Sequence, residues 1–125
     1  MERTERKTRN RRKTGSVKEQ MAAEYLEDQG YEILECNYHC RYAEIDLVAR
    51  EGEYLCFVEV KYRADDRFGA PEGVIPPQKM KKISLGAQFY MRDRHLPVDM
   101  PVRFDVVLII GNEISLIQNA FFFQR

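Results

Sequence analysis

The chain has 125 residues, 44% of them hydrophobic and 32% charged, which is enough for one domain with its own core. Twenty Lys and Arg balance twenty Asp and Glu, and this neutral total argues against a surface that coats DNA by charge alone. No apolar run is long enough to span a membrane and no signal-peptide pattern opens the chain. We therefore expect a soluble cytoplasmic protein whose three cysteines stay reduced.

Charge is unevenly spread along the chain. Residues 1–13 carry seven Lys and Arg against two Glu, whereas residues 14–125 carry thirteen against eighteen acidic residues. We expect residues 1–13 to form a basic, mobile arm, because such a segment has too few apolar side chains to fold alone. The arm is either a solubilising tail or a segment that contacts phosphates. Residues 14–125 are expected to form a single domain.

The first helix is expected from Ser16 to about Gln29, because apolar residues recur there at helical spacing and Gly30 follows as a stop signal. Ser16 and Glu19 have the spacing of a capping box, which gives Glu19 a structural role at the start of the helix. A first strand is expected at residues 31–42.

Residues 43–63 predict a β-hairpin closed by a tight turn at Glu51-Gly52. A two-residue turn makes Asp46 a diagonal neighbour of Glu59, and a four-residue loop places the two directly opposite each other. Both even-length turns put Asp46, Glu59 and Lys61 on one side of the sheet. Strict alternation assigns the first strand two faces: Glu44, Asp46 and Val48 on one, and Ile45, Leu47 and Ala49 on the other. The second strand is apolar on both faces, which indicates a central strand.

Two carboxylates this close do not both ionise cheaply unless a cation lies between them. Oxygen ligands without a nearby histidine favour Mg²⁺ or Mn²⁺, held by Asp46, Glu59 and the backbone carbonyl of Val60. Lys61 would then hold an attacking water. The alternative is a cross-strand salt bridge of Lys61 with Glu44 or Asp46. Spacing alone leaves both interpretations open.

Asp46 followed by Glu59-Val60-Lys61 resembles the PD-(D/E)xK signature of restriction-endonuclease-like nucleases. The run NYHCRYAEIDLVAREGEYLCFVEVKYR resembles the YraN family of small bacterial proteins within that superfamily, and the similarity continues over nearly the whole chain after residue 14. Ala43 and Lys18 depart from the family pattern, which usually has Gly at both positions. The resemblance implies a sandwich with an αβββαβ core and a Mg²⁺- or Mn²⁺-dependent nuclease acting on DNA. Junctions or flaps in repair or recombination are the implied substrates.

The resemblance also implies roles for individual residues. Asp46, Glu59 and Lys61 would be catalytic, with Asp46, Glu59 and Val60 holding the metal. Glu19 and Glu44 would support the site; for Glu19, capping and metal support are compatible. Contacts to nucleic acid are expected from Arg63, Lys79 and Arg103. Lys79 could instead lie on a solvated helix face, and Arg103 could instead pair with Asp105. The alternative function is a nucleic-acid-binding module with the same fold and little or no catalysis.

The rest of the chain completes an α/β sandwich with a mixed central sheet flanked by helices. Residues 64–76 predict a loop that contacts substrate, and residues 77–94 predict the second helix. Strands follow at residues 102–110 and 113–117. The phenylalanines at 121–123 cannot all share one buried face, so at least one is expected to meet another part of the fold or a second chain in a homodimer.

Overall fold

The structure is a computed structural model that describes residues 16–64 and 75–124. The described residues form a five-stranded sheet of order β1-β2-β3-β4-β5 and two helices. Pairing is parallel between β3 and β4 and antiparallel elsewhere, so the sheet is mixed and β3 is its central strand. The elements are α2 (Val17–Asp28), β1 (Glu32–His39), β2 (Glu44–Glu51), β3 (Tyr54–Arg63), α3 (Pro77–Asp93), β4 (Val102–Ile110) and β5 (Glu113–Phe121).

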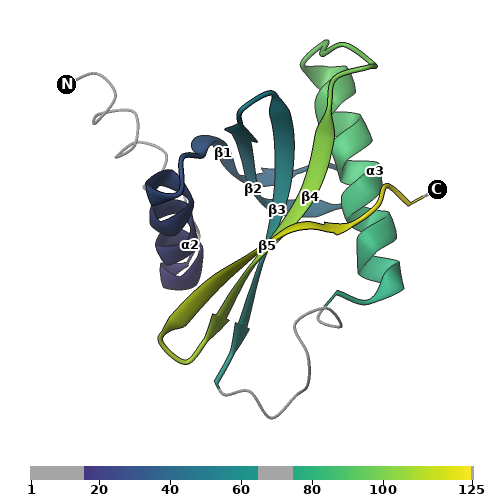
Figure 1. Cartoon of the computed structure of the whole chain (residues 1–125). Coiled ribbons are helices and arrows are strands. Elements are labelled where there is room, and N and C mark those ends of the chain that lie inside the picture. Colours follow the sequence, from purple (N-terminus) through teal and green to yellow (C-terminus); the bar gives the residue numbers. More distant parts are fainter. Residues whose placement is uncertain (1–15, 65–74, 125) are drawn as a thin grey trace.

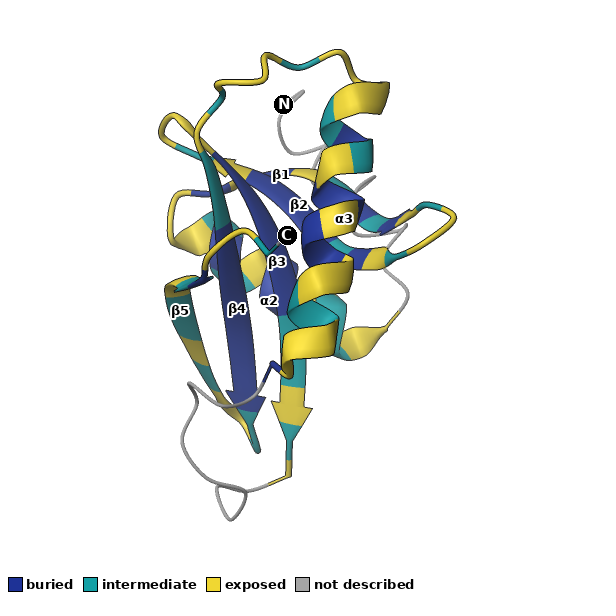
Figure 2. Cartoon of the chain, turned by 90° about the vertical axis from the view of Figure 1, so that its right-hand side faces the viewer, coloured by how far each residue is buried: buried dark blue, intermediate teal, exposed yellow. Residues whose placement is uncertain are grey.

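The helices cover opposite faces of the sheet, α2 on one side and α3 on the other (Figure 1). Ala22, Ala23 and Leu26 are the buried residues of α2, whereas Ile83 and Tyr90 are among those of α3. Strands β3 and β4 are buried over most of their length (Figure 2), because both of their faces are covered. The predicted α/β sandwich is confirmed, and the element order is consistent with a restriction-endonuclease-like core. The basic arm and most of the 64–76 loop lie outside the described residues.

Neither of the two described helices is both long and apolar enough to cross a membrane.

Helix α2 begins as the capping-box pattern predicts. The backbone N–H of Glu19 donates to Ser16 Oγ at 3.1 Å, which satisfies one of the amides that a helix start leaves without a partner.

We expect Ser16→Ala to lower the free energy of unfolding by about 1 kcal/mol, since the cap is lost while the helix stays otherwise intact. Urea denaturation followed by circular dichroism measures the change. Ser115→Ala is the matched control, because Ser115 is exposed on the edge strand β5 and should change stability by less than about 0.5 kcal/mol. Equal effects of the two substitutions would contradict the capping role.

The β2–β3 turn lies one residue later than predicted. Glu51 pairs with Tyr54, so Gly52 and Glu53 form a two-residue loop. Gly52 has a φ of 61°, and glycine is the residue that a type II′ hairpin favours at its first loop position. Extending this ladder to the next positions places Asp46 opposite Glu59, the arrangement expected of the longer predicted loop.

The alternation of β2 breaks at Asp46, and this corrects the predicted position of Ile45. Leu47 belongs to the core on the α2 face, whereas Ile45 packs in the core on the α3 face. On the neighbouring strand, Asn37 has a φ of 54°, a left-handed conformation that Asn tolerates better than most residues. Strict period-two alternation requires extended backbone at every residue. An irregularity at this level of the sheet therefore moves the residues before it to the opposite face from the one that alternation predicts.

Strand β5 continues to Phe121 rather than ending at Ile117 as predicted. Phe121 stacks on Phe104 and Phe123 packs edge-on against the same ring, whereas Phe122 is 78% exposed. The prediction that the three phenylalanines do not share one buried face is confirmed.

Candidate functional site

Asp46 lies where β2 separates from β3. The β2–β3 ladder ends at Leu47 and Val58, whereas β3 stays paired with β4 as far as Arg63. Beyond the ladder, the backbone N–H of Val60 donates to Asp46 Oδ2 at 2.8 Å. If the β2–β3 ladder continued, a backbone carbonyl of β2 would accept a hydrogen bond of this kind. Here the Asp46 carboxylate accepts it instead, which fixes the side chain between the two strands.

Glu59 meets Asp46 at this point. Glu59 is only 5% exposed, and its carboxyl group is hydrogen-bonded to that of Asp46. Burial, together with the hydrogen bond and negative charge of Glu59, raises the pKa of Asp46 to about 7, against the opposing effects of the Val60 N–H and the Glu19 carboxyl group. A proton shared between two carboxyl groups holds them together in the absence of another cation.

Glu19 combines the two roles that the sequence left open. Its backbone N–H is capped by Ser16, while its side chain is hydrogen-bonded to Asp46. Glu19 is therefore a third acidic side chain at this site. It comes from α2, on the face of the sheet opposite α3.

Lys79 approaches the pair from α3. Its Nζ lies 3.4 Å from Glu59 Oε2, and its side chain is 37% exposed. The ammonium group therefore compensates the buried charge of Glu59 while remaining accessible to solvent. Sequence reasoning assigned Lys79 to nucleic-acid contact or to a solvated helix face and missed this ion pair, because nothing local connects residues 59 and 79.

Lys61 and Glu44 do not form the alternative salt bridge within the described part of the chain. Lys61 is partly exposed and follows Glu59 by two strand positions, which places both on the same face of β3. Glu44 is exposed and pairs instead with His39, at 3.2 Å between Nδ1 and Oε1. Lys61 is therefore on the side of the sheet that carries Glu59, and Glu44 points toward β1.

The donor atoms at this site suit a hard divalent cation. Asp46 and Glu59 offer carboxylate oxygens and Val60 a backbone carbonyl, the ligand types that Mg²⁺ and Mn²⁺ prefer. Over residues 16–64 and 75–124, no three His, Cys, Asp or Glu side chains are placed as a complete metal-binding group. The protein would thus supply two carboxylates and a carbonyl, and Mg²⁺ commonly takes its remaining ligands from water and substrate phosphates. The residues present fit such an ion.

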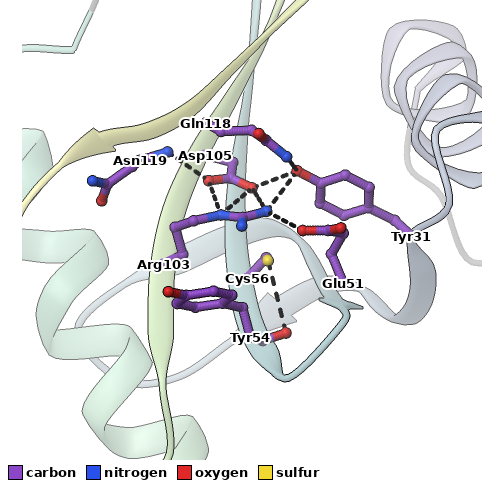
Figure 3. A network of polar contacts seen from close by, with 8 residues as sticks. All are labelled: Tyr31, Glu51, Tyr54, Cys56, Arg103, Asp105, Gln118 and Asn119. Carbon is purple, nitrogen blue, oxygen red and sulfur yellow. Dashed lines mark hydrogen bonds and ion pairs between the residues drawn. The ribbon is translucent and has the colours of Figure 1, made fainter.

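Arg103 lies in a different cluster, on the α2 face (Figure 3). Its Nε donates to Asp105 Oδ1 at 3.0 Å, and its Nη2 lies 3.0 Å from Glu51 Oε1. Asp105 is fully buried and also accepts from the Tyr31 hydroxyl at 2.7 Å and from the backbone N–H of Asn119 at 2.9 Å. Burial raises the pKa of Tyr31, which keeps its hydroxyl protonated as a donor.

The structure thus shows the Arg103–Asp105 pair that the sequence offered as an alternative to phosphate contact. The guanidinium is engaged with buried Asp105 and with the more exposed Glu51 on the face opposite α3, away from the Glu59–Lys79 pair. Sequence reasoning missed Tyr31 as a partner, because the Tyr31–Asp105 hydrogen bond joins residues 74 positions apart.

Arg63 ends β3, four residues after Glu59. Its Nη1 donates to the Tyr62 carbonyl at 3.1 Å, and its own carbonyl accepts from the Gly111 N–H. Arg63 therefore lies at the end of the strand, beyond Lys61.

Comparison with known proteins places the chain in a family. The model described as "Uncharacterised protein family UPF0102" matches residues 18–109. A UPF0102 protein of Lachnoclostridium phytofermentans is 51% identical over 112 residues, covering 90% of this chain and 95% of the relative. A UPF0102 protein of Syntrophus aciditrophicus is 47% identical over 120 residues, covering 93% of each chain. With matches of this extent, the chain belongs to the UPF0102 family.

Proposed function

We propose that this protein is a Mg²⁺- or Mn²⁺-dependent nuclease that hydrolyses phosphodiester bonds in DNA, in the manner of PD-(D/E)xK enzymes. The observation that carries the proposal is the hydrogen-bonded pair of half-buried Asp46 and buried Glu59 at the point where two strands separate. Two like charges in contact and largely removed from water are costly, and such a pair favours a role in binding a cation. The resemblance of the hairpin to the YraN family supports the same function.

The bound ion would supply a Lewis acid for the scissile phosphate and a water of lowered pKa. Asp46 and Glu59 would hold it together with the Val60 carbonyl, and the Val60 N–H keeps Asp46 in one orientation. Lys61 extends from the same face of β3 as Glu59, where its ammonium stabilises negative charge that develops on the phosphate.

Lys61→Ala tests this role. Cleavage of DNA in Mg²⁺ or Mn²⁺ should fall about a hundredfold, the effect of removing one donor that stabilises developing charge. Affinity for DNA should change by less than about threefold, since one phosphate contact contributes modestly to binding. Cleavage is measured on single-stranded, duplex, flapped and four-way-junction DNA, and affinity by fluorescence anisotropy. Lys81→Ala, an exposed lysine on α3, is the matched control. Unchanged cleavage by the Lys61 variant would remove it from the catalytic set.

A binding module without catalysis is the second candidate. The Lys79–Glu59 ion pair favours it, because an internal ammonium already compensates one of the two carboxylates. This candidate expects salt-sensitive DNA binding that weakens when residues 1–13 are removed, and no metal-dependent cleavage of any of the four substrates. Cleavage that disappears in the Asp46→Asn variant would exclude it.

A further inference from the structure

A pocket of about 360 Å³ lies beside the carboxylate pair, between the β1–β2 turn and α3. Its volume is within the range of pockets that hold small ligands or single groups of larger ones. Lys79 connects the two sites, because it lines this pocket and also pairs with Glu59. The lining residues are His39, Cys40, Arg41, Tyr42, Ala43, Glu44, Lys79 and Lys82. We call it the turn pocket.

The turn pocket combines cations with an aromatic ring. Arg41, Lys79 and Lys82 contribute positive charge, while the one acidic lining residue, Glu44, is paired with His39. Tyr42 is 50% exposed. This combination is the one that binds nucleic-acid strands, in which cations follow the phosphates and bases stack on aromatic side chains.

Tyr42 is held in place as a stacking surface. Its ring packs against Phe89 of α3 with a centroid distance of 5.3 Å and an interplanar angle of 30°. The helix approaches the turn closely, since a Cβ added at Gly86 would lie 3.1 Å from the Ala43 Cβ. A ring fixed in advance loses little side-chain entropy when a base stacks on it.

We propose that the turn pocket is a subsite for an unpaired nucleotide next to the scissile phosphate, with its base stacked on Tyr42 and its phosphate held by Lys79 and Lys82. A base inside a duplex is already stacked and paired, so only a single-stranded or extruded nucleotide reaches the ring. The inference rests on the proposed nuclease function and specifies its substrate class, which is DNA with unpaired nucleotides at the cleavage site.

The test measures binding separately from cleavage. The full-length Asp46→Asn chain, which is expected to have lost cleavage, is titrated with a fluorescent single strand and with a blunt duplex of the same length in metal-free buffer. Adding Tyr42→Ala should weaken binding of the single strand about tenfold, as expected for the loss of one base–aromatic stack, and leave duplex binding unchanged. Tyr42→Phe should keep the affinity, because the ring remains. Phe122→Ala, which removes an exposed ring outside the pocket, is the matched control.

The cations are tested in the same titration. Lys82→Ala should weaken binding of both DNAs and lower the salt slope of binding by about one. Equal single-strand affinity of the Tyr42→Ala and parent chains would overturn the subsite, and the nuclease function would then be judged by cleavage alone. Absence of any DNA binding by the parent, together with absence of cleavage by the unmodified chain, would overturn both. Thermal melting checks that each variant is folded.

Discussion

Asp46→Asn is expected to reduce metal-dependent DNA cleavage by about a thousandfold or more. The substitution would remove one of the two carboxylates proposed to hold the metal, and metal activation contributes several kcal/mol to such reactions. Cleavage is measured with Mg²⁺ and with Mn²⁺ on the four DNA substrates. A variant that still cleaves at the parent's rate would show that the activity comes from another protein or another site.

The same substitution is expected to stabilise the metal-free protein. Asn retains an oxygen that accepts from the Val60 N–H, and its amide can donate to the Glu59 carboxylate. The pKa of Asp46 is raised from its ordinary 3.8 to about 7, so the protonated form is favoured in the folded state. The contribution of protonated Asp46 to the free energy of unfolding is complete below about pH 4 and is lost as the pH rises through about 7. We expect a gain of about 2 to 3 kcal/mol at pH 8.

Denaturation in EDTA at pH 5 and pH 8 measures this gain. The difference between Asp46→Asn and the parent should be larger at pH 8, because the parent must then ionise the buried pair. Millimolar Mg²⁺ should raise the melting temperature of the parent and leave that of the variant unchanged. A variant that is less stable than the parent at pH 8 would contradict the view that the two carboxylates repel each other in the folded protein.

Asp105→Ala is expected to lower the free energy of unfolding by about 3 to 5 kcal/mol. Asp105 is fully buried and is hydrogen-bonded to Arg103, Tyr31 and the backbone of Asn119. Removing its carboxylate leaves the largely buried Arg103 guanidinium without its main partner. A buried charge that has lost its partner destabilises the folded state strongly. Urea denaturation measures the loss, and Asp99→Ala, at an exposed acidic residue, should stay within about 0.5 kcal/mol of the parent.

Arg103→Ala separates the structural role from phosphate contact. If the guanidinium serves the network in Figure 3, this variant is also strongly destabilised, because Asp105 is then buried without its cation. A stable Arg103 variant with weakened DNA binding would instead support the phosphate contact that the family resemblance implies.

Local patterns in the sequence predicted much of the fold. The capping residue Ser16, the extent of α3 and the whole of β4 follow from turn signals and apolar periodicity, which report short-range preferences of the backbone. The same patterns missed the end of β5, where Asn119 adopts a φ of 54° and the register shifts between Phe104 and Val106. An irregular strand does not produce a regular alternation.

By itself, the sequence determined that Asp46 lies on one strand of a hairpin and that Glu59 and Lys61 share a face of the next strand, because side chains alternate along a regular strand. Only the tertiary structure decided that Asp46 meets Glu59 and Glu19 where β2 leaves β3, and that Lys79 pairs with Glu59 and shares a pocket with Tyr42. These contacts join residues far apart in the chain. Packing of the two helices on the sheet sets the contacts, and periodicity within one segment carries no information about such packing.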